Sequence, residues 1–161
     1  MKRITLAFLF VCSLSFAIEP FSLPWMNHET PGTLFNTNDY PDGIFVIHPY
    51  FIYCPVNYEL EPKVNELASD YASEPRVHVL DIGVDKKDSD YEKWIDRVKP
   101  NHPVLRDSER TVVQALGITQ YPTTIIFDGS GNIHYRSTPG VWSKTEEEKI
   151  RGTIDWLLQK P

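Results

Sequence analysis

Residues 44–57, IFVIHPYFIYCPVN, join an apolar run, a cysteine and a proline in an order that sets the fold. The first four, Ile44 to Ile47, follow an Asp-Gly pair and are mostly β-branched, which predicts a buried strand. Pro55 suits the first position of a helix, where a missing N–H costs nothing. Cys54 therefore lies between a predicted strand and a predicted helix.

The residues after Cys54 continue with a helical pattern. Apolar side chains recur on one face, at Val56, Leu60, Val64, Leu67 and Tyr71. Pro62 lies inside this pattern and removes one backbone N–H. Because the apolar face continues beyond it, we predict that Pro62 kinks the helix and does not end it.

The rest of the chain predicts further strands and helices. Periodicity, turn residues and capping motifs place strands at 77–84, 123–127 and 133–136, and helices starting near Ser89, Ser108 and Ser143. Ser89 with Glu92, and Ser143 with Glu146, have the spacing of capping boxes. Residues 18–42 are expected to be irregular, with one short edge strand. The resulting β-α-β-α-α-β-β-α order predicts an α/β fold, with a central mixed sheet flanked by helices on both faces.

The first 17 residues have the three parts of a secretory signal peptide. A basic start precedes an apolar run from Ile4 to Phe16, and Ser15-Phe16-Ala17 is a small-x-small cleavage pattern. We predict cleavage after Ala17, a single domain over residues 18–161, and export, to the periplasm or otherwise. The apolar run is shorter than the roughly 20 residues of a membrane span, so an uncleaved anchor is the less favoured alternative.

Charge and cysteine content narrow the function further. The net charge of −6 becomes about −8 without Lys2 and Arg3, which argues against binding to nucleic acid or anionic membranes. Cleavage also removes Cys12, so Cys54 cannot form an internal disulfide and is either inert, paired with another molecule, or reactive. The five histidines show no ligand spacing, and we expect no metal or cofactor.

Several separated motifs occur in the order of a known family. In the first motif, Tyr53-Cys54-Pro55, the cysteine is followed eight residues later by Pro62. The second motif, Tyr121-Pro122-Thr123-Thr124, precedes a predicted hairpin. Over roughly residues 21–160 the chain resembles the thioredoxin superfamily, and in particular its exported thiol–disulfide proteins of the TlpA/ResA type. The resemblance implies a thioredoxin-like fold and a cis Tyr121–Pro122 bond against Cys54. It also implies that Tyr53, Pro55, Tyr121 and Pro122 contact an extended substrate.

The sequence departs from this family at the second active-site cysteine, where Asn57 stands. A helix N-terminus favours the thiolate of Cys54, which can attack a disulfide, but Asn57 cannot resolve the product. We therefore predict monothiol exchange with exported cysteine-containing proteins or a low-molecular-weight thiol. Asn57 either donates to the thiolate or satisfies the helix end. His48, six residues before Cys54, is either a proton shuttle or a structural histidine.

Two other functions stay open. The first is a redox-inactive binding module of an exported assembly, for which Tyr50, Phe51, Tyr53 and Tyr58 either form a docking surface or pack inward. The second is a one-cysteine peroxidase, which needs a threonine or serine shortly before the cysteine. Residues 49–53 contain neither, so the peroxidase is the weaker alternative.

Overall fold

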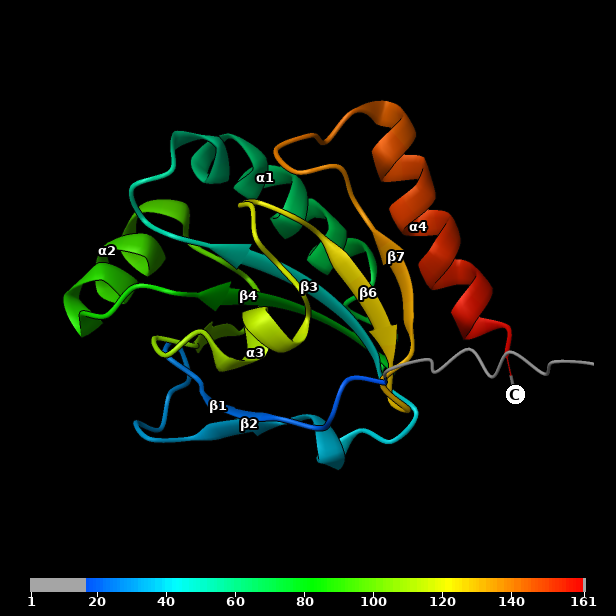
Figure 1. Cartoon of the computed structure of the whole chain (residues 1–161), viewed down its shortest axis with the longest axis horizontal. Helices are drawn as coiled ribbons and strands as arrows, with labels where there is room; N and C mark the ends of the chain where they lie inside the picture. The colour runs from blue at the N-terminus through cyan, green and yellow to red at the C-terminus, as the bar shows by residue number, and fades with distance from the viewer. Residues whose placement is uncertain (1–16, 161) are drawn as a thin grey trace, which may run out of the picture.

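The chain folds around a five-stranded mixed β-sheet (Figure 1). This computed structural model describes residues 17–160. The strands lie in the order β5-β4-β3-β6-β7, with bounds β3 Ile44–Tyr50, β4 Val77–Gly83, β5 Val104–Arg106, β6 Ile125–Asp128 and β7 Ile133–Arg136. β3, β4 and β5 are parallel, whereas β6 runs antiparallel to both β3 and β7. The predicted mixed sheet is confirmed.

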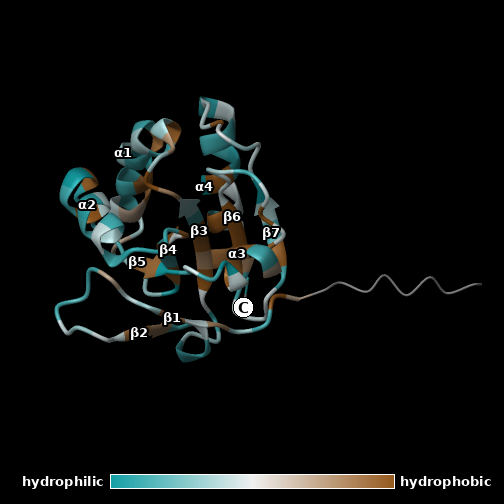
Figure 2. Cartoon of the chain, turned by 60° about the vertical axis from the view of Figure 1, so that its left-hand side comes forward, coloured by the Kyte–Doolittle hydropathy of each residue, from teal (hydrophilic) through white to brown (hydrophobic). Residues whose placement is uncertain are grey.

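Helices cover both faces of this sheet, as expected. α1 (Pro55–Asp70) and α4 (Lys144–Leu158) pack on one face, and α3 (Thr111–Ala115) packs on the other. α2 (Asp88–Val98) lies beside α1 and contributes Tyr91 and Trp94 to a small aromatic core with Tyr50. Figure 2 shows the hydrophobic residues concentrated on the sheet, with hydrophilic residues on the outer sides of the helices.

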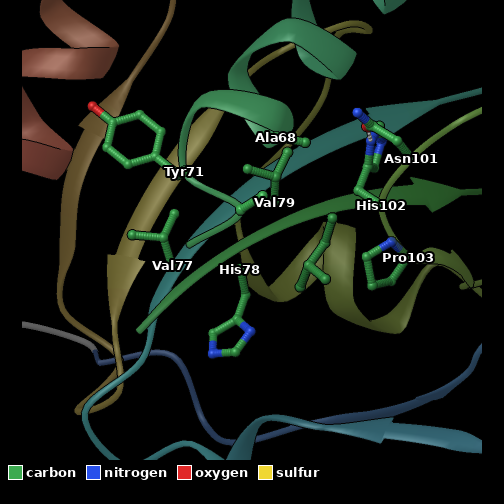
Figure 3. Close-up of a pocket in the computed structure, with 10 residues that line it drawn as sticks. Ala68, Tyr71, Val77, His78, Val79, Asn101, His102 and Pro103 are labelled. Atoms are coloured by element: carbon green, nitrogen blue, oxygen red, sulfur yellow. Dashed lines mark hydrogen bonds between the residues drawn. The ribbon is translucent and has the colours of Figure 1, made fainter. Parts of the chain in front are cut away.

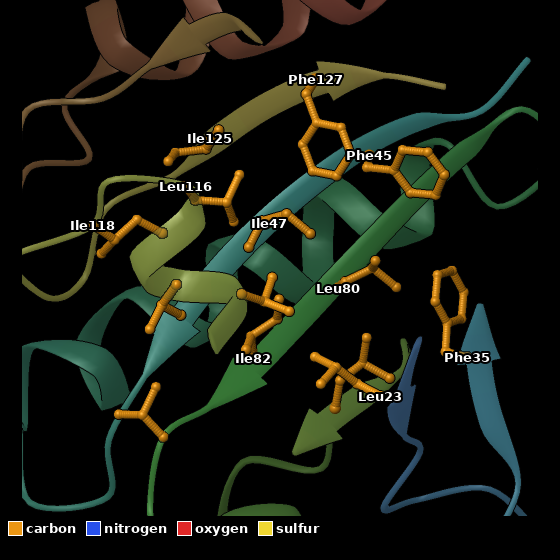
Figure 4. Packing of buried hydrophobic residues seen from close by; sticks show 14 residues of the cluster. Leu23, Phe35, Phe45, Ile47, Leu80, Ile82, Leu116, Ile118, Ile125 and Phe127 are labelled. Carbon is orange, nitrogen blue, oxygen red and sulfur yellow. The ribbon is translucent and has the colours of Figure 1, made fainter. Parts of the chain in front are cut away.

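The core that is shared with α3 shows why the central strand begins with an apolar run. On this face of the sheet, Ile47 of β3 lies near Leu116, and Phe45 of β3 lies beside Phe127 and Phe35 (Figure 4). The alternate residues of β3 face α1 and α4, so all seven residues of the strand are buried. A strand covered on both faces reads as a continuous apolar run, which made β3 recognisable in the sequence.

The segment before β3 is more regular than the sequence predicted. β1 (Ser22–Pro24) and β2 (Leu34–Asn36) form a separate antiparallel pair, followed by a 3₁₀ turn, η1 (Thr37–Asp39). Leu23 and Phe35 are the buried residues of the two strands and join the α3-side core. The expectation of one short edge strand was wrong, because three-residue strands carry only one inward side chain each and leave no readable alternation.

Two helix starts also differ from the predictions. α2 begins at Asp88 after Lys87, without a side-chain cap, so the capping box assigned to Ser89 is wrong. Two aspartates in its first turn interact favourably with the helix dipole in place of the cap. α3 begins at Thr111 and not near Ser108, because the buried Asp107 carboxylate accepts the first-turn N–H groups. β5, just before Asp107, was not predicted as a strand.

Other boundaries agree with the predictions. α1 runs through Pro62 to Asp70, so the prediction that this proline does not end the helix is confirmed. Gly117 follows α3 with a φ of +65° and ends it, as expected. Ser143 Oγ accepts the Glu146 N–H at 3.2 Å and caps α4. Within the described part of the chain, no helix is long and apolar enough to cross a membrane. The predicted signal peptide covers residues 1–17, and all of it except Ala17 lies outside the described residues.

Candidate functional site

Cys54 occupies the N-cap of α1, directly after the loop that leaves β3. Its side chain is partly exposed and makes no capping hydrogen bond to the helix. The sulfur therefore combines solvent access with the positive end of a 16-residue helix, and both properties suit a nucleophilic thiolate. This is the position that the sequence predicted.

The loop before Cys54 is held by hydrogen bonds from both sides. The Cys54 N–H donates to the Phe51 carbonyl at 3.1 Å. The Ile52 N–H donates to the Asp85 carboxylate at 3.0 Å, which ties the loop to the end of β4. Burial raises the pKa of Asp85, although the Ile52 N–H opposes that rise. Cys54 is therefore presented by an anchored loop.

Asn57 is fully buried one turn into α1. Its amide nitrogen donates to the Phe51 carbonyl at 3.0 Å, so the side chain fastens the active loop to the helix. This structural role differs from the predicted one, in which Asn57 satisfies the helix end, because the amide donates to a loop carbonyl. A hydrogen bond from Asn57 to the thiolate stays a prediction.

The second loop of the candidate site carries the cis peptide bond between Tyr121 and Pro122. The Tyr121 ring packs edge-on against Phe51, with centroids 5.8 Å apart, so this loop lies next to the Cys54 loop. Pro122 is buried, and its carbonyl accepts the Gly140 N–H at 2.8 Å. Across residues 17–160, no hydrogen bond engages the backbone N–H or C=O of Tyr121.

The four aromatic residues near Cys54 divide between the core and the surface. Tyr50 is fully buried and stacks on Trp94, with centroids 4.0 Å apart. Tyr58 is half-buried beneath the Arg97 guanidinium. Tyr53 is 73% exposed beside the cysteine, and Pro55 is also exposed. Tyr53 is therefore the exposed one of the four, and any docking surface at this end of the molecule would centre on it. The four residues do not share one role, because Tyr50 belongs to the core.

His48 lies on β3 beneath the start of α1 and is buried. Burial lowers its pKa to about 4, against an opposing effect of the Asp81 carboxylate, so the imidazole is neutral at neutral pH. Neither ring nitrogen has a hydrogen-bond partner within the described chain. Both nitrogens are buried away from solvent. Proton shuttling by His48 stays a prediction.

The structure brings His48 together with three polar residues that sequence reasoning did not connect to it. Asp81 is its direct neighbour on β4, Glu61 approaches from α1, and His102 from the loop before β5. Burial and the neighbouring Asp81 carboxylate raise the pKa of Glu61 above its usual value. A signal existed in the sequence, because Asn57, Glu61 and Val64 follow helical spacing on the buried face of α1.

A mixed sheet, a partly exposed cysteine at the first helix and a cis-proline loop beside it define the thioredoxin-like class of folds. The comparisons with known proteins agree. The AhpC/TSA family matches residues 17–136, and the chain belongs to this family.

Individual relatives carry names from thiol–disulfide chemistry. The thiol:disulfide interchange protein DsbE of Pasteurella multocida is 29% identical over 136 residues, which cover 79% of this chain and 71% of the relative. The thiol-disulfide oxidoreductase ResA of Halalkalibacterium halodurans is 27% identical over 106 residues, or 66% of this chain and 59% of the relative. A thiol-disulfide oxidoreductase from Bacteroides fragilis has a similar structure, with a TM-score of 0.71 and 16% identity, covering 85% of this chain and 98% of the other.

Proposed function

We propose that this protein is an exported thioredoxin-like protein that carries out thiol–disulfide exchange on polypeptides through the single thiol of Cys54. The observation that carries the proposal is the partly exposed cysteine at the N-cap of α1. The names of the relatives DsbE and ResA support the same general chemistry. Export rests on the signal-peptide pattern that ends at Ala17.

The proposed reaction is a single exchange step. The Cys54 thiolate attacks one sulfur of a substrate disulfide, and a new bond forms between Cys54 and that sulfur. The old sulfur–sulfur bond breaks, and the second substrate cysteine leaves as a thiolate that takes a proton from water. Asn57 has no sulfur with which to attack the mixed disulfide and expel the substrate, so release requires a thiol from another molecule. That thiol is a second cysteine of the polypeptide or a low-molecular-weight thiol.

Substrate binding is proposed to use both loops of the site. The free backbone groups of Tyr121 suit an extended peptide, which would pair with them as an added strand. The exposed ring of Tyr53 and the ring of Pro55 would then contact apolar side chains that flank the substrate cysteine. Pro122 is buried and supports the loop from behind.

The test is to trap the mixed disulfide. Cells that produce the protein are quenched with acid, free thiols are alkylated, and the protein is separated on non-reducing gels. We expect adducts that disappear on reduction and are absent from Cys54→Ser. A matched control is Ser130→Ala, a hairpin-turn residue far along the chain from the cysteine. Absence of Cys54 adducts, together with unreactivity toward a peptide disulfide in vitro, would contradict the exchange function.

The alternative, a redox-inactive binding module, is favoured by one observation, which is the 73% exposure of Tyr53. Such a module would retain its partners after Cys54→Ser and lose them after Tyr53→Ser. If the protein exchanges disulfides, Cys54→Ser should lose the partners and Tyr53→Ser should affect their capture less, because covalent capture depends on the sulfur. The same pull-down under reducing and non-reducing conditions separates the two functions.

A further inference from the structure

Four ionisable side chains meet in the interior, between the sheet and α1. His48 and Asp81 are side by side on neighbouring parallel strands, and ligand-type atoms of His48, Glu61 and Asp81 all lie within 4.8 Å of one another. His102 Nε2 is 3.6 Å from Glu61 Oε1 and 3.4 Å from Asp81 Oδ1. The side chains of Glu61, Asp81 and His102 are at most 3% exposed. We call these four residues the buried cluster.

Two carboxylates in one buried place need a positive charge or protons to offset them. Within residues 17–160, no lysine or arginine forms an ion pair with Glu61 or Asp81. Several atoms that face one another also lack hydrogen-bond partners in the same range: both His48 nitrogens, both Glu61 oxygens, Asp81 Oδ1 and His102 Nε2. So many unpartnered polar atoms at one site are rare in protein interiors.

The outward contacts of the buried cluster orient its members toward a common centre. His102 Nδ1 is 3.2 Å from Asn101 Oδ1, which fits an Nδ1–H donor and leaves the Nε2 lone pair facing the carboxylates. Asp81 Oδ2 accepts the Trp94 indole N–H at 2.9 Å, so Oδ1 is the oxygen turned inward. Hydrogen bonds of this kind, behind the inner atoms, are typical of residues that ligate metals.

The spacing of the inner atoms distinguishes a hydrogen bond donated by His102 from ligation of a metal ion. An N–H···O hydrogen bond needs about 2.7–3.2 Å, and both His102 distances are longer than that. A tetrahedral zinc ion with bonds of about 2.0–2.2 Å holds neighbouring ligand atoms about 3.3–3.6 Å apart. The two His102 distances fall in this second range.

We propose that His48, Glu61, Asp81 and His102 bind one divalent transition-metal ion, with zinc as the best match. Two imidazole nitrogens and two carboxylate oxygens form a recognised type of zinc ligand set. Two carboxylates and one divalent cation are also neutral together, which suits a buried site. The site lies behind the exchange site and involves neither Cys54 nor the cis-proline loop.

Surface clefts border the buried cluster on two sides and offer a route for the ion. His102 lines a cleft of about 250 Å³, where Figure 3 shows it next to Asn101 and Pro103. Glu61 lines a second cleft of about 240 Å³ between α1 and α2. One proposed ligand lines each of these clefts, so both clefts lead toward the cluster.

The test begins with metal content. The protein, purified without a polyhistidine tag, is analysed by mass spectrometry for metals, then stripped with a chelator and titrated with Zn²⁺ and Co²⁺. We expect one equivalent of metal per chain, a higher melting temperature on loading, and the visible absorption of four-coordinate Co²⁺. A folded, stripped protein that binds neither ion with one-to-one stoichiometry would overturn the proposal.

Variants then assign the ligands. Asp81→Asn and Glu61→Gln preserve size and should weaken metal binding by at least about 100-fold. Glu61→Gln serves as the second variant in case Asp81→Asn fails to fold, with folding checked by circular dichroism. Cys54→Ser and His28→Gln lie outside the buried cluster and should bind metal like the parent. Parent-like binding by folded Glu61→Gln, or loss of binding in Cys54→Ser, would refute the assignment, and neither result depends on whether Cys54 exchanges disulfides.

Discussion

Asn57→Cys is the most informative change in the exchange site. It restores a second thiol one helical turn after Cys54, at the position where the resembled family has its resolving cysteine. If Cys54 forms mixed disulfides, the new thiol should attack them and release the substrate. In the presence of dithiothreitol, we expect the variant to turn over a peptide disulfide faster than the parent, whose covalent adduct must wait for the external thiol.

The structure also predicts how much the substitution Asn57→Cys lowers the free energy of unfolding. The side chain of Asn57 is buried and donates one hydrogen bond, to the Phe51 carbonyl at 3.0 Å. The Phe51 carbonyl keeps its hydrogen bond from the Cys54 N–H, so losing the second bond costs about 0.5–1.5 kcal/mol, and the reduced variant should be less stable than the parent by about that amount. A disulfide across so short a loop returns roughly 2 kcal/mol in the chain-entropy model. The oxidised variant should therefore come close to the stability of the parent.

The assay combines urea unfolding of both redox forms with turnover of a fluorescent peptide disulfide. Asn57→Ser is the matched control, because serine has nearly the size of cysteine but no thiol. It should lose the same stability as reduced Asn57→Cys and gain no turnover. If Asn57→Cys closes an internal disulfide and still shows no more turnover than Asn57→Ser, the single-thiol explanation is wrong.

Three further changes test the surroundings of the site. Asp107→Ala removes the buried carboxylate that accepts three first-turn N–H groups of α3, so urea unfolding should show a loss of about 3 kcal/mol, against little change for the exposed neighbour Glu109→Ala. Tyr53→Ala should leave the free energy of unfolding within about 0.5 kcal/mol but slow the reaction with a peptide disulfide, measured under pseudo-first-order conditions. Burial raises the pKa of Asp128, but hydrogen bonds from His134 and Asn132 outweigh it and hold that pKa below its usual value. A depressed carboxyl pKa stabilises the fold above the unfolded pKa of about 3.9, so the stability difference between parent and His134→Ala should shrink as pH falls below about 4.

The sheet and its helices were predictable where one pattern repeats over several residues. β3 has seven consecutive buried residues, and α4 has both a serine cap and an apolar stripe. β1, β2 and β5 are three-residue strands whose pairing comes from tertiary contacts, such as the bridge between Trp25 and Leu105. Local sequence carries too little information to define strands of that length.

The exchange site and the buried cluster differed in how readily the sequence predicted them. Cys54 and Pro122 were recognisable because each belongs to a short motif with a fixed local geometry. The buried cluster was not, because its members come from β3, α1, β4 and a loop, and His48 and His102 are 54 residues apart in the chain. The histidines show no ligand spacing along the sequence. They lie close to the carboxylates because of the strand register that pairs His48 with Asp81 and the helical repeat that places Glu61 on the buried face of α1.

α1 connects the exchange site to the buried cluster, and its sequence is unusual for a core helix. Its first two buried positions, Asn57 and Glu61, are polar, and apolar burial begins only at Val64. In the N-terminal half of the helix, Leu60 and Tyr58 are only partly buried against the core, and Pro62 removes a hydrogen-bond donor at the middle of the helix. Polar interactions must then hold this half in place: Asn57 through the Phe51 carbonyl, and Glu61 through Asp81, His102 and the ion that we propose. Because Cys54 caps the same half of the helix, the groups that fix Glu61 also fix the direction in which the thiol is presented.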